Sequence, residues 1–232
     1  MKLGKRLTHI SDMVLPGYTH IWDCCCDHGL LGATLLERNL APFIHFVDIV
    51  PQLMIDIEKK LLRFHPEDRN LVNSPQWKVH CLDVATLPII EHSGKHLVII
   101  AGVGGDLITH FIQAISRCNP TADIHYLLCP VHHLYHVRKS LIDLDFYLLD
   151  ERLIKENRRF YELLLVTPSK PSADYMKVSP VGEKIWQTKS AEQTTIANDY
   201  LKNTLNHYHR TQTGSAFDTQ PIIDAYKSVV VG

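Results

Sequence analysis

Aspartate residues follow the first three predicted β-strands of this 232-residue chain. Asp23 and Asp27 lie in residues 22–32, a run that leaves one strand and enters a helix, and Asp48 and Asp83 end the next two strands. A carboxylate at the end of a second strand can accept hydrogen bonds from both hydroxyls of a ribose. The spacing therefore predicts a nucleoside-containing ligand, either a dinucleotide or an adenosyl sulfonium.

The first turn favours a positively charged ligand over a pyrophosphate. Pyrophosphate sites usually carry a trio of glycines there, whereas Asp23 and Asp27 place two carboxylates in this turn. These charges would repel a pyrophosphate and attract a sulfonium that also bears an ammonium group. The simpler alternatives are that Asp27 caps the following helix, that Asp48 is a turn residue and that Asp83 is a solvated loop carboxylate.

Three consecutive cysteines, Cys24 to Cys26, share this turn with His28. Zinc sites usually take paired cysteines from separated positions, and the sequence contains no second pair. We therefore expect reduced thiols that fill a tight turn, and no bound metal. His132 and His136 have a spacing that can chelate a metal on a helix, but they lack a matching partner, so a surface position is expected.

The strands and helices that position these residues alternate along the chain. Predicted strands cover residues 18–22, 43–47, 77–82, 97–100, 125–128, 146–150 and 161–166, and predicted helices cover 5–15, 30–37, 52–64, 107–116 and 132–144. This alternation predicts an α/β fold, an open sheet with helices on both faces. Ligands bind such sheets outside the carboxyl ends of the strands, where the aspartates and the glycine-rich run 102–105 lie.

The end of the chain predicts two further features. The last two predicted strands are joined by a connection too short for a crossover helix, so they should be antiparallel, which favours a class I methyltransferase sheet over a plain dinucleotide-binding one. After Pro171 the sequence becomes polar. We expect a sheet domain over residues 1–168 and a small helical appendage over 169–232, with a flexible break at 211–215 and a short helix at 221–230.

Composition limits the class of protein. A hydrophobic fraction of 45% and a formal charge of -1 fit a globular chain and exclude a strongly basic nucleic-acid-binding protein, although a local basic patch is compatible with them. The sequence has no apolar run long enough to span a membrane and no secretory signal, so we expect a cytoplasmic protein. Motifs of common hydrolases and phosphoryl-transfer enzymes are absent from the sequence.

Four segments together carry a resemblance to a known family. They are Lys5-Arg6-Leu7, Asp23-x-x-x-Asp27-His28-Gly29-x-Leu31, Ile100-Ala101-Gly102-Val103-Gly104-Gly105 and Tyr161-Glu162-x-Leu164. In that order they resemble the TrmK family of bacterial tRNA adenine-N1 methyltransferases, over roughly residues 3 to 167. The resemblance implies a Rossmann-like domain that binds S-adenosylmethionine, followed by a helical region that helps to hold tRNA.

The resemblance also implies roles for individual residues. The turn from Asp23 to His28 would surround the methionine part of the cofactor, Asp48 would hold its ribose and Asp83 would approach its adenine. Asp27, His28 and Gly102 would position the groups between which the methyl is transferred. The cofactor-binding candidates are Asp23, Cys25, Asp27, His28, Asp48, Ile49, Asp83, Val84, Ala101, Gly102 and Gly104.

The sequence gives less information about contacts to RNA than about the cofactor site. The positively charged candidates for the RNA backbone are Lys5, Arg6, Arg138, Lys139, Arg158 and Arg159, each of which is also compatible with a solvated surface. The family tends to have Gln and Asn where this chain has Cys129 and Val131. A non-catalytic RNA-binding protein with a vestigial cofactor fold is therefore one alternative, and an NAD-dependent oxidoreductase is another.

Overall fold

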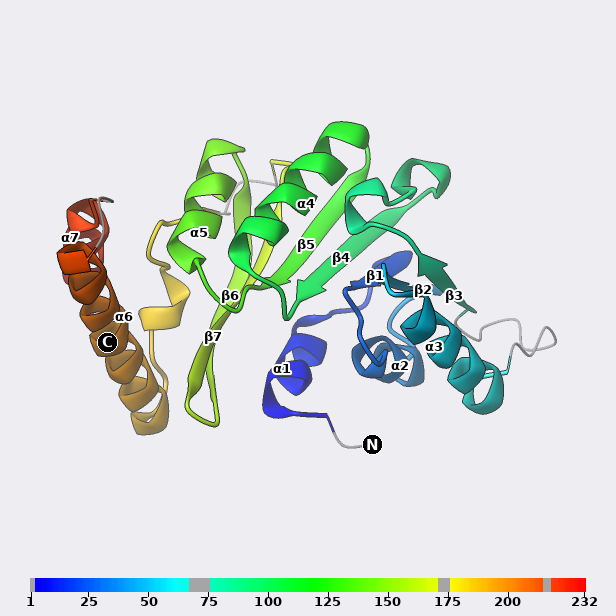
Figure 1. Cartoon of the computed structure of the whole chain (residues 1–232), viewed down its shortest axis with the longest axis horizontal. Coiled ribbons are helices and arrows are strands. Elements are labelled where there is room, and N and C mark those ends of the chain that lie inside the picture. The colour runs from blue at the N-terminus through cyan, green and yellow to red at the C-terminus, as the bar shows by residue number, and fades with distance from the viewer. Residues whose placement is uncertain (1–2, 67–75, 171–175, 215–217) are drawn as a thin grey trace.

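A computed structural model describes residues 3–66, 76–170, 176–214 and 218–232 (Figure 1). Its strands are β1 His20–Cys24, β2 Phe43–Asp48, β3 Gln76–Cys81, β4 Lys95–Ala101, β5 Asp123–Cys129, β6 Tyr147–Glu156, β7 Arg159–Thr167 and β8 Met176–Lys177. Its α-helices are α1 Lys5–Met13, α2 Leu30–Glu37, α3 Pro51–Phe64, α4 Gly105–Cys118, α5 Leu134–Asp143, α6 Ala191–Gly214 and α7 Gln220–Lys227. Short 3-10 helices are η1 Val84–Thr86, η2 Ile89–Glu91 and η3 Lys184–Trp186. Each strand and helix predicted for the sheet domain is present.

The strands form one eight-stranded sheet in the order β3-β2-β1-β4-β5-β7-β6-β8. The pairs β1–β2, β1–β4, β2–β3 and β4–β5 are parallel, whereas β7 pairs antiparallel with both β5 and β6. The predicted antiparallel arrangement of the last two strands is therefore confirmed. Because β1 and β4 are neighbours, their carboxyl ends and the loops that follow them meet at one point of the sheet edge.

Helices cover both faces of the sheet, as predicted (Figure 1). On one face α1, α2 and α3 pack through residues that include Leu35 and Ile57, and on the other α4 and α5 pack through Ile112 and Leu141. Residues 97–100 of β4 are completely buried. A central parallel strand is covered on both sides, which explains why this stretch of the sequence is uniformly apolar rather than alternating.

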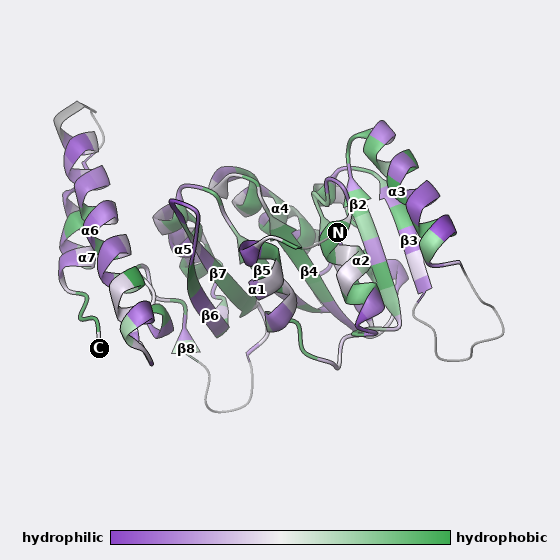
Figure 2. Ribbon diagram, turned by 90° about the horizontal axis from the view of Figure 1, so that it is seen from below, coloured by the Kyte–Doolittle hydropathy of each residue, from purple (hydrophilic) through white to green (hydrophobic). Residues whose placement is uncertain are grey.

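The C-terminal region packs beyond the β6–β7 end of the sheet. Helices α6 and α7 lie side by side there, and α6 is mostly hydrophilic (Figure 2). A small core of Trp186, Tyr200 and Tyr226 packs against Leu153 of β6 and Phe160 of β7. Aromatic packing thus attaches the helical appendage to the sheet. The burial of large rings contributes strongly to stability.

Two details of this region differ from expectation. Strand β8 pairs antiparallel with β6, so the region begins with a strand rather than being wholly helical. The break expected at 211–215 is wrong over residues 211–214, because α6 continues to Gly214, and residue 215 lies outside the described residues. The predicted last helix is present as α7. In the described parts of the chain, no helix is both long and apolar enough to cross a membrane.

Arg138 is fully buried, which removes it from the candidates for RNA contact. Its guanidinium lies 2.6 Å from a carboxylate oxygen of Glu151 and 2.6 Å from one of Glu162, and it donates to the carbonyl of Ser179 at 3.1 Å. Glu162 also accepts a hydrogen bond from the Tyr200 hydroxyl. These contacts join α5, β6 and β7 to the C-terminal region, and they leave the charge of Arg138 compensated inside the protein.

Four buried histidines form a second polar cluster, on the sheet face that carries α4. His20 Nδ1 lies 3.0 Å from His45 Nε2, and His45 Nδ1 lies 2.9 Å from His80 Nε2. Trp22 stacks on His45 with ring centroids 3.7 Å apart and donates its indole N–H to His96 at 3.2 Å. Burial lowers the pKa of His20 and His80 to about 4 and that of His45 to about 2. This histidine stack is therefore neutral at neutral pH.

Candidate active site

A cleft of about 290 Å³ lies at the carboxyl ends of β1 and β4. The turn of residues 23–28 forms one wall, residues 101–103 form another, and the start of α2 and the side chain of Arg6 close it. Cys25 and Asp27 have φ angles of 55° and 49°, in the left-handed region that L-residues seldom adopt. This turn therefore holds its peptide groups in an unusual orientation toward the cleft, as functional sites often do.

Asp23 is the most deeply buried acid of the cleft, with 4% of its surface exposed. Its Oδ2 accepts a hydrogen bond from the N–H of Gly32, in the first turn of α2, at 2.8 Å. Burial raises the pKa of Asp23 to about 7, and the bond from Gly32 opposes that rise. Asp23 can therefore change its ionisation near neutral pH, and a cation placed beside it would favour the carboxylate.

Asp48 holds the turn from the neighbouring strand. Its Oδ2 accepts from the N–H of Asp27 at 3.3 Å, and its Oδ1 accepts from the N–H of Val50 at 3.1 Å. The side chains of Asp27 and His28 are 72% and 60% exposed at the rim of the cleft, and His28 Nε2 lies 3.7 Å from Asp27 Oδ1. Asp48 thus stabilises the backbone of the turn, while Asp27 and His28 keep their polar atoms available.

Three nearby carboxylates help to keep the thiol of Cys25 protonated. Burial, with the added negative charges of Asp48, Asp23 and Asp83, raises the pKa of Cys25 to about 12. Asp83 itself is exposed and caps η1 by accepting from the N–H of Ala85 at 2.9 Å. Because the thiol stays neutral while acids surround it, the side of the cleft formed by this turn attracts cations.

The glycine-rich run after β4 meets the loop after β5. Gly102 has a φ of 86° and donates its N–H to the carbonyl of Cys129 at 3.3 Å. Only glycine adopts this conformation without strain. At Gly104 a side chain would overlap the imidazole of His132. The two loops therefore form one floor, open above Gly102 and covered by His132 above Gly104.

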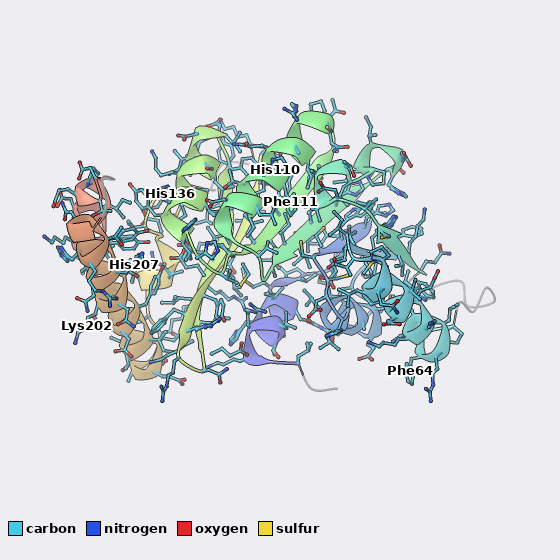
Figure 3. The ribbon with its side chains drawn as sticks, in the orientation of Figure 1. Phe64, His110, Phe111, His136, Lys202 and His207 are labelled. Atoms are coloured by element: carbon cyan, nitrogen blue, oxygen red, sulfur yellow. The ribbon has the colours of Figure 1, made fainter. Side chains whose placement is uncertain are left out.

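A larger groove of about 600 Å³ lies between this floor and α6. His132 lines it from the loop before α5 and His136 from α5 itself, Arg159 and Tyr161 line it from β7, and His207 lines it from α6. Figure 3 marks His136 and His207, which reach the groove from opposite sides. Imidazole and phenol rings are surfaces on which nucleobases stack, and an arginine can pair with a phosphate.

The groove and the cleft adjoin. Val103 lines the cleft and Val131 lines the groove, and the N–H of Val131 donates to the carbonyl of Val103 at 3.0 Å. The Arg6 guanidinium of the cleft lies over the ring of Tyr161, which lines the groove. A ligand in the cleft and a second ligand in the groove would therefore meet across the glycine floor.

The structure brings together only part of the predicted cofactor set. The candidates that line the cleft are Asp23, Cys25, Asp27, His28, Ala101 and Gly102. Asp48 and Asp83 contribute through charge and hydrogen bonds at its edge, as described above. Val84 is a core residue with 3% exposure, Ile49 is 65% exposed, and Gly104 lies under His132.

The positively charged candidates are scattered. Lys5, Lys139 and Arg158 are exposed, Arg159 lines the groove, and Arg6 lines the cleft. The sequence interpretation missed both the groove and the place of Arg6. The closely spaced histidines at 132, 133 and 136 were the available signal for the groove, but their partner His207 is far away in sequence.

Two of the three cysteines in the turn are buried, as the sequence predicts, whereas Cys25 is partly exposed and lines the cleft. Cys24 and Cys26 are 1% and 9% exposed, and all six cysteines are free thiols. Within the described ranges, no group of three or more histidine, cysteine, aspartate or glutamate side chains is arranged to hold a metal ion.

A carboxylate-rich cleft at the first turn, a parallel sheet and an antiparallel β7 define a class I methyltransferase fold. Residues 3–164 match the family described as "Methyltransferase domain", and the chain belongs to that family. The chain is 28% identical to the tRNA (adenine(22)-N(1))-methyltransferase of Bacillus subtilis over 225 residues, which cover 95% of this chain and 89% of that protein.

Solved structures share the fold over nearly the whole length. The B. subtilis m1A22 tRNA methyltransferase TrmK superimposes with a TM-score of 0.70 at 20% identity, covering 97% of each chain. M. capricolum TrmK, in complex with S-adenosylhomocysteine, gives a TM-score of 0.71 at 17% identity and covers 98% of this chain and 97% of its own. The fold similarity includes the C-terminal region as well as the sheet.

Proposed function

We propose that the protein is an S-adenosylmethionine-dependent methyltransferase that methylates N1 of an adenine in tRNA, at position 22 as in its curated relative. The observation that carries this proposal is the acidic cleft joined by the glycine floor to a groove of imidazole and phenol rings. The cleft suits a cationic adenosyl cofactor, and the groove suits a nucleotide. The similarity to the B. subtilis enzyme over 95% of the chain supports the same substrate.

The residues of the cleft fit the proposed cofactor by charge and position. Asp23 and Asp27 would receive the ammonium group of its methionine part, and Asp48, at the end of β2, would accept from the ribose hydroxyls. Asp83 would lie toward the adenine. The neutral thiol of Cys25 among carboxylates provides a negative, partly desolvated surface for a sulfonium.

The chemistry requires alignment more than proton transfer. When bound, S-adenosylmethionine supplies an activated methyl group, and N1 of adenine has a free lone pair at neutral pH. Gly102 would let the base approach because it carries no side chain at the open part of the floor, and Asp27 and His28 would order the rim. Their contribution would be a proximity effect.

The groove and the C-terminal region would bind the RNA. N1 is reached only when the adenine leaves its pair or stack, and the groove offers rings to receive an extruded nucleotide. Arg159 within the groove and Lys5, Lys139 and Arg158 around it would contact phosphates. Residues 169–232 would act as a tRNA-holding arm on a methyltransferase domain of residues 1–168. We infer that the enzyme works in the cytoplasm, with its tRNA substrate.

Methyl transfer to a defined transcript tests the proposal. Purified protein, labelled S-adenosylmethionine and a tRNA transcript with adenine at position 22 should give 1-methyladenosine, identified by nuclease digestion and mass spectrometry. The same transcript with guanine at that position is the control and should remain unlabelled. A protein that binds S-adenosylhomocysteine but labels neither transcript would contradict the proposed substrate.

A further inference from the structure

Arg6 is the only lysine or arginine among the described residues that line the cleft. It projects from α1, and one terminal nitrogen of its guanidinium lies 3.8 Å from where a Cβ atom on Gly102 would be. Its central carbon lies 5.1 Å from the centre of the Tyr161 ring. The positive charge is thus held over an aromatic face beside the floor of the cleft, an arrangement that restrains a guanidinium.

The Arg6 side chain has unused donors. Its Nε is buried, and none of the described residues accepts a hydrogen bond from it. Glu156 accepts from the backbone N–H of Arg6 at 3.1 Å, but within the described ranges no carboxylate forms a salt bridge with the guanidinium. The buried Nε is out of reach of a ligand, but the terminal nitrogens, one of which lies beside Gly102, keep their donors for a ligand in the cleft.

The charges of the cleft are arranged in two groups. Asp23 and Asp27 belong to the turn after β1, whereas Arg6 stands beside Gly102 at the end of β4. An amino acid zwitterion carries an ammonium and a carboxylate on one carbon atom. A ligand of that kind would place its ammonium toward the two aspartates and its carboxylate toward Arg6, satisfying both groups of charge at once.

We propose that Arg6 binds the carboxylate of the methionine part of the cofactor, rather than an RNA phosphate. This assignment rests on the proposed function, because it presupposes an adenosyl cofactor with an amino acid end. The guanidinium fork matches the oxygens of a carboxylate and of a phosphate equally well. The experiment must therefore separate these two sources of the anion.

Calorimetry with two matched ligands makes that separation. S-adenosylhomocysteine carries the carboxylate, and its decarboxylated analogue lacks only that group. Arg6→Gln should weaken binding of S-adenosylhomocysteine by about 10- to 100-fold, the usual effect of losing a hydrogen-bonded charge, and should leave the affinity for the analogue unchanged. Arg6→Lys should recover part of the loss. Arg152→Gln is the matched control. Arg152 lies on β6, which contacts α1, but it does not line the cleft, so this change should alter neither affinity.

Two results would overturn the assignment. An equal loss for both ligands in a variant whose thermal unfolding is unchanged would mean that Arg6 shapes the cleft without touching the carboxylate. Unchanged affinity for S-adenosylhomocysteine with weakened affinity for tRNA would mean that Arg6 contacts RNA. Wild-type protein that binds S-adenosylhomocysteine without methylating tRNA contradicts the proposed substrate but not this role of Arg6, whereas failure to bind it contradicts both.

Discussion

The protein places histidines in two contrasting settings. In the histidine stack, His45 is hydrogen-bonded to both His20 and His80 on the sheet face that carries α4, and each of these residues is at most 9% exposed. In the groove, His132 and His207 are exposed and face the space between the sheet and α6. In the stack, each imidazole is a flat, neutral ring that packs and forms hydrogen bonds inside the protein. In the groove, the imidazole rings are accessible to a ligand.

The contrast shows that environment, not residue type, decides what a histidine contributes. A buried ring without a carboxylate partner loses its proton, because the charged form is poorly solvated there. The same ring at a surface remains available to stack on a ligand and to hydrogen-bond to it. The two settings should therefore respond differently to pH and to substitution.

The largest expected effect is acid destabilisation through the stack. His20, His45 and His80 have pKa values of about 4, 2 and 4 when folded, below the ordinary 6.5. Between pH 6.5 and 4 the unfolded chain binds more protons, so their contribution is full above pH 6.5 and declines as the pH falls. Each excess proton costs about 1.4 kcal/mol per pH unit, or about 4 kcal/mol per pH unit for three.

Denaturant unfolding at pH 7.5, 6 and 5 measures this slope. A His207→Gln variant should show the same slope as the wild type, because His207 lies on α6, outside the histidine stack. A slope that disappears in His207→Gln, or a stability independent of pH over this range, would contradict the comparison.

The second effect is the loss of a stack member. His45→Ala removes a ring that packs on Trp22 at 3.7 Å and leaves two neighbouring imidazoles without their partner. We expect a loss of about 2–4 kcal/mol in the free energy of unfolding, from the cavity and the unpaired polar atoms together. Affinity for S-adenosylhomocysteine, measured below the melting temperature, should remain. Loss of cofactor binding without loss of stability would make the stack functional rather than structural.

A third effect extends the comparison to a buried group inside the cleft. The folded pKa of Asp23 is about 7, above its unfolded value, so its ionisation in the folded protein costs stability at pH 8. Asp23→Asn keeps an acceptor for Gly32 and should raise the free energy of unfolding by about 1–3 kcal/mol at pH 8. The gain should shrink as the pH falls from 7 toward 4.

The same variant should bind S-adenosylhomocysteine more weakly, since the ammonium group would lose a charged partner. Chemical denaturation at pH 8 and near pH 4 measures the change in stability, and calorimetry measures the change in affinity. A variant that is both less stable at pH 8 and equal in affinity would show that Asp23 is an ordinary structural carboxylate.

The smallest effect on stability belongs to the groove. His207→Ala should change the free energy of unfolding by less than about 0.5 kcal/mol, because the side chain is exposed. Affinity for tRNA should fall by about 1–3 kcal/mol if a base stacks on this ring. Filter binding at two salt concentrations measures it, with Lys227→Ala on α7 as a surface control. Unchanged affinity in His207→Ala would place the RNA elsewhere.

Periodicity and turn chemistry were enough to predict seven strands of the sheet. The apolar run 97–100, the aspartates at and just after the ends of β2 and β3, and the short connection before β7 are local signals, and local signals determine element type and direction. They also determined that the acidic residues and the glycine floor share one edge, because parallel strands align their carboxyl ends. Cofactor class and family followed from the same short motifs.

Contacts between distant segments were decided only by tertiary structure. Nothing local distinguishes Arg138, buried between two glutamates, from Arg158 on the surface, and nothing local places Arg6 inside the cleft rather than on an RNA-binding face. The same holds for the groove, which exists because aromatic packing sets α6 opposite the loop after β5. Burial and pairing depend on which elements pack together, so the charge and role of an ionisable side chain are settled after folding and not before it.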